Sequence, residues 1–150
     1  MWRCDDIGLR LAADRAAWGE EDAALDVSLG GRLFDLLAEL RRPTRLVPQI
    51  VHGDLFGNVL FSGDEPPGIV DFTAYHRPPE WAAAVVAVDA LAWGGGDEGL
   101  LRRWSHLPEW SQALLHALLF RLAVHALHPH STQQSMRGLE RAYHQITAYI

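Results

Sequence analysis

The sequence predicts an α+β fold that is mostly α, a single domain over residues 1–150 in which helices surround a small antiparallel β hairpin. Two observations lead to this class. Helical patterns occupy both ends of the chain, and short extended segments lie between them, within residues 46–72. The chain has 150 residues, of which 49% are hydrophobic, so it is long and apolar enough to form one core without disulfides.

Two helices are expected before the extended segments. Apolar residues over 9–18 indicate a short amphipathic helix that ends at Gly19. Ser28 is a suitable N-cap for a second helix over residues 29–42, in which leucines recur with the helical period. Pro43 ends this second helix, because proline cannot continue the backbone hydrogen-bond ladder.

Three short strands are expected next, over residues 46–51, 58–61 and 68–72. Glycines and prolines in 62–68 form a short turn between the second strand and the third. Strands joined by so short a turn pair antiparallel, so these two should form a hairpin. The chain is expected to become helical again after Tyr75.

The rest of the chain is predicted to be helical. Residues 80–93 are rich in alanine and valine and apolar on nearly every side, which indicates a buried helix. Pro78 and Pro79 suit the start of this helix, and glycines 94–96 suit its end. Further helices are expected over residues 100–104, 109–127 and 131–149.

Charge and composition exclude several classes of function. The formal net charge is −6, and without a basic stripe we expect no nucleic-acid partner. All 13 basic residues are arginine, so this chain can supply no lysine to a Schiff base or to a nucleotide phosphate. The single cysteine, Cys4, excludes an intramolecular disulfide. No apolar run is long enough for a membrane span and no signal pattern is present, which predicts a cytoplasmic protein with no membrane partner.

The strongest chemical signal is the sequence His-Gly-Asp-Leu-Phe-Gly-Asn over residues 52–58, followed by Asp71 at the end of a strand. Phosphoryl transfer needs a carboxylate that takes or orients the proton of the attacking hydroxyl, and hard oxygen ligands for magnesium. Asp54, Asn58 and Asp71 supply these groups. Asp54 and His52 are therefore the candidate catalytic residues, with His52 bracing the loop by hydrogen bonds. The alternative is that both segments hold ordinary turn and strand-end residues.

Residues 51–61 and 69–72 together resemble the aminoglycoside phosphotransferase family, a kinase-like family that includes small-molecule kinases for choline and sugars. The family motif contains His-Gly-Asp, then Asn, then a strand that ends in Ile-Asp-Phe or Ile-Asp-Leu. The resemblance implies Asp54 as the catalytic base and Asn58 and Asp71 as ligands of Mg²⁺. It also implies ATP as the phosphoryl donor and a small-molecule hydroxyl as the acceptor, bound in the helical part after Asp71.

The same resemblance identifies the chain as the C-terminal lobe of a protein-kinase-like fold, the lobe that carries the catalytic loop. The ATP-clasping N-terminal lobe would need roughly a hundred residues with a glycine-rich loop and a lysine. Only 51 residues precede His52, and their pattern is helical. We therefore expect a truncated form that is inactive alone and can self-associate through the exposed half-cleft. The alternative function is a non-catalytic, pseudokinase-like or protein-interaction module.

Two further departures from the family pattern concern the site itself. Three residues separate Asp54 from Asn58, where the family has four, and Gly57 is the residue that can adapt the backbone. The family often has another aspartate at the start of the helix that follows the metal-binding aspartate. Here that helix opens with Trp81 and three alanines, and Asp89 lies about two turns later.

Three other features allow competing interpretations. Residues 94–99 match the dinucleotide fingerprint G-x-G-x-x-G, but the alanine-rich run before them favours a helix end and a turn. His125, His128 and His130 have a spacing that metal ligands can have, but Pro129 interrupts the helix, which favours a polar helix end. Arg77 could contact a phosphate or form a structural ion pair.

Overall fold

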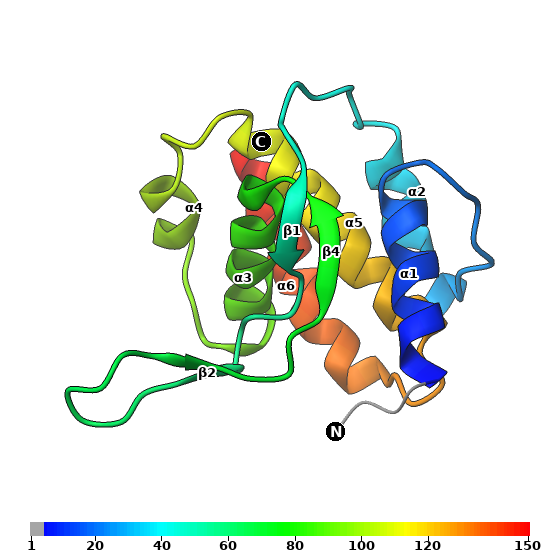
Figure 1. The fold of residues 1–150 in the computed structure, drawn as a ribbon. Helices are drawn as coiled ribbons and strands as arrows, with labels where there is room; N and C mark the ends of the chain where they lie inside the picture. The colour runs from blue at the N-terminus through cyan, green and yellow to red at the C-terminus, as the bar shows by residue number, and fades with distance from the viewer. Residues whose placement is uncertain (1–4) are drawn as a thin grey trace.

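The computed structural model describes residues 5–150, so Cys4 lies outside the described residues. Most of the chain is helical, and its strands form small antiparallel pairs, which confirms the predicted α+β class. Helix α5 (Trp110–Leu127) runs through the centre of the molecule (Figure 1). Four helices pack around α5: α1 (Asp5–Ala17), α2 (Gly31–Ala38), α3 (Pro79–Trp93) and α6 (Gln133–Tyr149).

The position of α5 follows from its sequence. Apolar residues occupy nearly all of its sides, so it is stable only where other elements cover it completely. Leu114, Leu118 and Leu122 are fully buried among its neighbours. Phe120 makes edge-on contacts with Tyr75 and Trp81, with ring centroids 5.5 and 5.3 Å apart. These aromatic contacts join the strands to the helical core.

The second predicted helix is shorter than expected and begins differently. A 3-10 turn, η1 (Val27–Leu29), precedes α2, and Asp26 caps it instead of Ser28 because the Asp26 carboxylate accepts the backbone N–H groups of Ser28 and Leu29. Gly30, with φ of 132°, separates the turn from α2. A backbone angle of this kind favours glycine, so one continuous helix over residues 29–42 was a wrong prediction.

Helix α2 ends at Ala38, before Pro43 is reached. The chain beyond it turns toward α1, where the Arg41 guanidinium donates hydrogen bonds to the carbonyl oxygens of Ala16 (2.8 Å) and Ala17 (3.3 Å). A cation at the carboxyl end of a helix satisfies carbonyl groups that have no partner within the helix. Arg41 therefore caps α1 and does not extend α2.

The strands form two separate pairs. Strand β2 (Val59–Leu60) pairs antiparallel with β3 (Gly68–Ile69), which confirms the predicted hairpin, although both strands are shorter than expected. Strand β1 (Gln49–His52) pairs antiparallel with β4 (Ala74–Arg77). The expectation of helix directly after Tyr75 was wrong, because Tyr75 is buried while its neighbours in β4 are more exposed, the alternation of a strand.

Both strand pairs are built from the same two stretches of chain. The first stretch, residues 49–60, carries β1 and then β2, and the second, residues 68–77, carries β3 and then β4. Residues 53–58 lie between the strands of the first stretch and face residues 70–73, which lie between the strands of the second. The β1–β4 pair lies against the helical body, while the β2–β3 hairpin projects from it (Figure 1). The predicted site residues therefore lie where the hairpin leaves the body.

The segment that matches a dinucleotide fingerprint is a helix end and a turn. The backbone N–H groups of Gly94 and Gly96 both donate to the carbonyl of Ala90, which closes α3, and α4 (Gly99–Arg103) follows. No strand precedes these glycines, since α3 runs directly into them. None of the helices within residues 5–150 combines the length and apolar character needed to cross a membrane.

Candidate active site

Hydrogen bonds join the predicted catalytic loop, residues 52–58, to the segment that contains Asp71, residues 70–73. The backbone N–H of Val70 donates to the carbonyl of Asn58, and the N–H of Gly53 donates to the carbonyl of Thr73, both at 3.0 Å. These two bonds hold the loop against the Asp71 segment at positions where neither belongs to a strand. The loop and the Asp71 segment are thus held as one unit.

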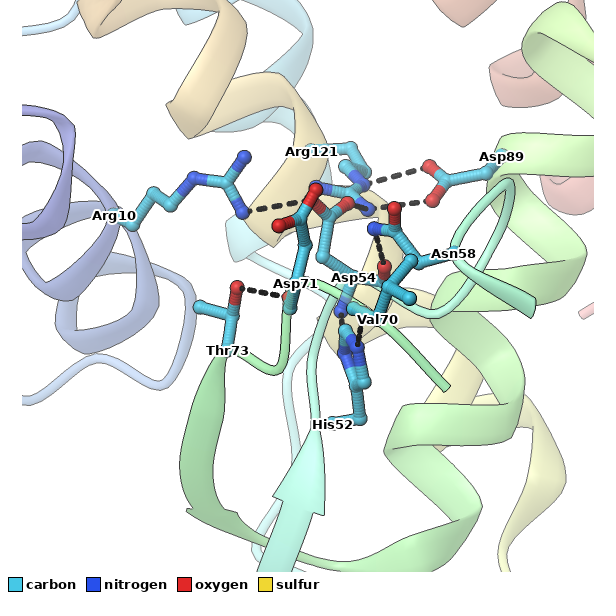
Figure 2. Close-up of polar contacts among 9 residues, drawn as sticks. All are labelled: Arg10, His52, Asp54, Asn58, Val70, Asp71, Thr73, Asp89 and Arg121. Atoms are coloured by element: carbon cyan, nitrogen blue, oxygen red, sulfur yellow. Dashed lines mark hydrogen bonds and ion pairs between the residues drawn. The ribbon is translucent and has the colours of Figure 1, made fainter. Parts of the chain in front are cut away.

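His52 braces this unit through both ring nitrogens. Its Nδ1 accepts the backbone N–H of Asp54 at 3.0 Å, so the ring proton is on Nε2, which donates to the carbonyl of Val70 at 3.3 Å. The imidazole also meets the Phe72 ring edge-on, with centroids 5.2 Å apart. Figure 2 shows the ring below the site, on the side away from the Asp54 carboxylate. His52 orients the loop and does not reach the side chain that would act on a substrate.

The Asp54 carboxylate lies between two arginines. Its Oδ2 is 3.0 Å from Nη1 of Arg10, on α1, and its Oδ1 is 2.8 Å from Nη2 of Arg121, on α5 (Figure 2). Burial alone would raise the pKa of Asp54, but the charges and hydrogen bonds of Arg121 and Arg10 outweigh it and hold the pKa below its ordinary value. Asp54 is therefore ionised at neutral pH.

Arg121 also binds Asp89, on α3. Its Nε lies 2.6 Å from Oδ1 of Asp89, and its Nη2 lies 2.5 Å from Oδ2. Both side chains are buried. Burial alone would lower the pKa of Arg121, but its two carboxylate partners raise it above the ordinary value, so the guanidinium stays charged. Asp89 thereby fixes the arginine that contacts Asp54.

The sequence prediction did not include Arg10 or Arg121, although one signal was available for Arg121. It is the single Asp, Glu, Lys or Arg between Trp110 and Leu127, in a segment that is otherwise apolar. Asp89 is likewise the single such residue over 81–93. A lone charge in each of two buried helices predicts that the charges pair, since an unpaired buried charge is costly.

Asn58 reaches Asp54 despite the short loop. Gly57 adopts φ of 80°, and the backbone N–H of Asn58 donates to the carbonyl of Leu55 at 2.9 Å, which closes a tight turn. The Asn58 amide Nδ2 then donates to the backbone carbonyl of Asp54 at 2.6 Å. Figure 2 shows the amide oxygen pointing away from this carbonyl, toward the side of Asp89 and Arg121. The oxygen is thus directed away from the loop backbone.

Asp71 is exposed and has a left-handed backbone conformation, with φ of 48°. Strand β3 ends at Ile69, so Asp71 lies two residues beyond it, opposite the catalytic loop. In Figure 2 its carboxylate points toward the arginine side of the site, as the Asp54 carboxylate does, and away from His52. A non-glycine residue with positive φ occurs where the surrounding structure requires it, often at functional sites.

The oxygen atoms of Asn58 and Asp71 have the chemistry that Mg²⁺ prefers. Magnesium is usually held by one or two protein ligands, with phosphate oxygens and water completing its shell. Two protein ligands therefore suffice, and the orientation of the Asn58 amide leaves its oxygen for this purpose. Within residues 5–150, no group of three or more His, Cys, Asp or Glu side chains could hold a metal ion, so a metal bound by protein alone is not favoured.

A pocket of about 480 Å³ opens beside the catalytic loop. Asp54 and Asn58 form part of its wall, whereas Asp71 does not. Phe56 lies over Gly94 at the end of α3, so closely that a side chain at position 94 would collide with the ring. The other lining residues are Gly57 of the loop and residues from α3, α5, α6 and the connection between α5 and α6: Asp89, Trp93, Arg121, Val124, His125, His128, His130, Ser131 and Ser135.

Two residues singled out from the sequence have structural contacts. Arg77 binds Asp14 (2.8 Å) and Glu20 (2.7 Å) and lies over the Trp18 ring, which confirms the structural ion-pair interpretation. His125 uses both ring nitrogens, since Nδ1 donates to the carbonyl of Leu29 and Nε2 contacts the hydroxyl of Ser135, each at 2.7 Å. His125 therefore has no nitrogen left for a metal.

Comparison with known proteins gives the family. The sequence model of the phosphotransferase enzyme family (APH) matches residues 4–116, well over half of the chain, and the chain belongs to this family. The match includes the catalytic loop, the Asp71 segment and α3. Neither a curated protein nor a solved structure gave a match to the chain. Enzymes of this family are phosphotransferases, which agrees with the chemistry expected from the motif.

Proposed function

We propose that residues 1–150 form the catalytic-loop lobe of a kinase-like phosphotransferase that transfers the γ-phosphoryl group of ATP to a hydroxyl of a small molecule. The observation that carries this proposal is the position of Asp54. Its carboxylate lies in the wall of a pocket large enough for a small molecule, next to Asn58. A base beside a substrate-sized pocket and two oxygen donors for a metal are what this reaction requires.

In the proposed reaction, the oxygen of the acceptor hydroxyl attacks the γ-phosphorus of ATP. The bond between that phosphorus and the bridging oxygen to the β-phosphate breaks, and ADP leaves with the electron pair. Asp54 takes the hydroxyl proton and later gives it to water. Arg10 and Arg121 hold the carboxylate in place for this transfer.

Asn58 and Asp71 would hold Mg²⁺ in this function. The ion, when bound, neutralises charge on the β- and γ-phosphates. Asn58 also positions the base, because its amide holds the backbone carbonyl of Asp54. The chain contains no lysine, so any lysine on the nucleotide phosphates must come from a polypeptide outside these 150 residues.

Transfer of radiolabelled γ-phosphate from ATP to a panel of hydroxyl compounds tests the proposal. The assay should use both the 150-residue chain and the longest natural polypeptide that contains it. Asp54→Asn removes the base, whereas Asp64→Asn changes an exposed carboxylate in the β2–β3 turn and serves as the matched control. Transfer that is lost only in Asp54→Asn supports the proposal, and equal transfer by Asp54→Asn and the unaltered protein would refute the role of Asp54.

One observation favours a second candidate, a non-catalytic module that binds a partner. Both carboxylate oxygens of Asp54 are already paired with arginines, as expected of a structural ion pair. In that case the natural polypeptide would transfer no phosphate to any acceptor, with or without Asp54→Asn. Both candidates predict that Asp54→Asn weakens folding, so the labelled-phosphate assay separates them.

A further inference from the structure

We infer that the pocket beside Asp54 accepts an uncharged hydroxyl compound with a flat apolar face, and not a polycationic amino sugar. This inference rests on the proposed function, since it names the class of acceptor for that site. It follows from the charge balance of the ion-pair cluster at the pocket, from two aromatic side chains that line the pocket and from the polar groups that line it with them.

The charge balance excludes recognition of several ammonium groups. Among the described residues that line the pocket, Asp54 and Asp89 are the carboxylates. Both are bound by Arg121, and Asp54 is also bound by Arg10. Arg121 lines the pocket and Arg10 does not, but the connected cluster of two carboxylates and two guanidinium groups has no net negative charge. A polycation would therefore lose its hydration without gaining an ion pair, which is unfavourable.

Aromatic side chains supply the affinity in place of charge. Phe56 and Trp93 line the pocket and remain 40% and 47% exposed, respectively. The Trp93 indole donates to the carbonyl of Ser135 at 3.2 Å, which fixes the ring, and Phe56 is held against Gly94. Rigid aromatic rings bind flat apolar surfaces with little loss of side-chain entropy.

Polar groups in the same pocket suit hydroxyls. His128, His130 and Ser131 lie on the connection between α5 and α6 and line the same pocket. The Nδ1 of His128 accepts the backbone N–H of His130 at 3.2 Å, which gives this connection a defined shape. Imidazole and hydroxyl groups can donate and accept hydrogen bonds without requiring a charged partner. Aromatic rings and hydrogen-bonding groups in one pocket match an aryl glycoside or a similar uncharged molecule.

Calorimetric titration of the 150-residue chain tests this inference without requiring catalysis. The probes are phenyl β-D-glucopyranoside, methyl β-D-glucopyranoside and kanamycin, each at low and at high salt. The phenyl glucoside should bind tighter than the methyl glucoside, and its affinity should be insensitive to salt. Kanamycin should bind more weakly than the phenyl glucoside at both salt concentrations.

Trp93→Ala should lower the affinity for the phenyl glucoside about tenfold, the value of roughly one stacked ring. Trp104→Ala is the control, because Trp104 is similarly exposed but does not line the pocket. Kanamycin binding that exceeds phenyl glucoside binding and weakens with salt would overturn the inference, as would failure of the folded chain to bind the phenyl glucoside. Either result would overturn the acceptor class but would not bear on whether the protein transfers phosphate. Glucoside binding without phosphate transfer by any natural form would instead refute the proposed function and leave the acceptor class standing.

Discussion

Arg121 places its Nη2 atom 2.8 Å from Oδ1 of Asp54, and the same guanidinium is bound by Asp89. The candidate base therefore depends on a residue 67 positions away in sequence, on the central helix. A buried pair of this kind fixes geometry more than it adds stability. Removing one partner is costly, because the other charge then remains in the core without compensation.

Replacing Arg121 should show that losing one partner of the buried ion pair costs more stability than losing both. Arg121→Met should lower the free energy of unfolding by about 3–5 kcal/mol, since it leaves Asp89 buried and unpaired. The double variant Asp89→Leu with Arg121→Met should lose clearly less than the sum of the two single variants. Urea unfolding of all four proteins measures the coupling. Strictly additive losses would mean that the two side chains do not stabilise each other.

Asp54→Asn should abolish nearly all phosphoryl transfer in the natural polypeptide while the fold is retained. The amide keeps the shape of the side chain but cannot take a proton from the acceptor. Two ion pairs are weakened as well, so the unfolding free energy should fall by about 3 kcal/mol, within the stability of an ordinary domain. Circular dichroism and the labelled-phosphate assay measure the two effects separately.

Asn58→Ala should raise the magnesium concentration needed for half-maximal transfer more than it raises the KM of the acceptor. The substitution removes the proposed oxygen ligand of the metal and the hydrogen bond to the Asp54 carbonyl. Asp71→Asn should act in the same direction and serves as the companion variant. An unchanged magnesium titration for Asn58→Ala would remove Asn58 from the metal site.

Stability should depend on pH through Asp54. Its pKa is lower in the folded protein than the value of about 3.9 expected in an unfolded chain. The stabilisation is therefore fully present above about pH 4 and is lost as the pH falls through the folded-state pKa. The difference in unfolding free energy between the unaltered chain and Asp54→Asn should be constant near neutrality and shrink below pH 4. A gap that widens in acid would contradict the ion-pair assignment.

The 150-residue chain alone should bind Mg·ATP weakly and transfer no phosphate. Asp54 is the proposed base and Asn58 and Asp71 are the proposed metal ligands, but the chain has no lysine for the α- and β-phosphates. Calorimetry with Mg·ATP and a phosphate-release assay measure both properties. Micromolar affinity with turnover would show that other residues hold the nucleotide.

Self-association should accompany this weak binding. Large apolar side chains of β1, the hairpin and their flanks are exposed, among them Val47, Ile50, Leu60, Phe61, Ile69 and Phe72. Exposed apolar patches of this kind favour contact between copies. Sedimentation velocity should show oligomers that Phe61→Ser reduces, and a monomer at all concentrations would rule this out.

Much of the fold followed from patterns local in sequence. Helices α3 and α5 were predicted within a residue or two, because their apolar character extends over many turns. The hairpin was predicted from its turn residues. Strand β4 was missed because its four residues gain their strand character from pairing with β1, more than twenty positions earlier. Such pairing is not visible in a short window of sequence.

The site was predicted only as far as its motif extends. The side chains of His52 and Asn58 each bond to the backbone of Asp54, as a tight loop requires. The arginines around Asp54 were not predicted, because Arg10 is 44 positions from Asp54 and Arg121 is 67 positions away. Only the packing of α1 and α5 against the loop brings these charges together. The single charges in α3 and α5, Asp89 and Arg121, were the available signal. They predict that these two side chains pair, but not that Arg121 also contacts Asp54.

The placement of the β2–β3 hairpin has a mechanical consequence. Asn58 comes directly before β2 and Asp71 two residues after β3, and the Val70–Asn58 hydrogen bond ties their segments together. Asp54, in contrast, is anchored to α1 and α5 by its arginines. The Asn58 amide also holds the backbone carbonyl of Asp54, so the projecting hairpin, its oxygen donors and the base belong to one connected segment (Figure 1). A force on the hairpin would therefore reach the helical body through Asp54 and its two arginines.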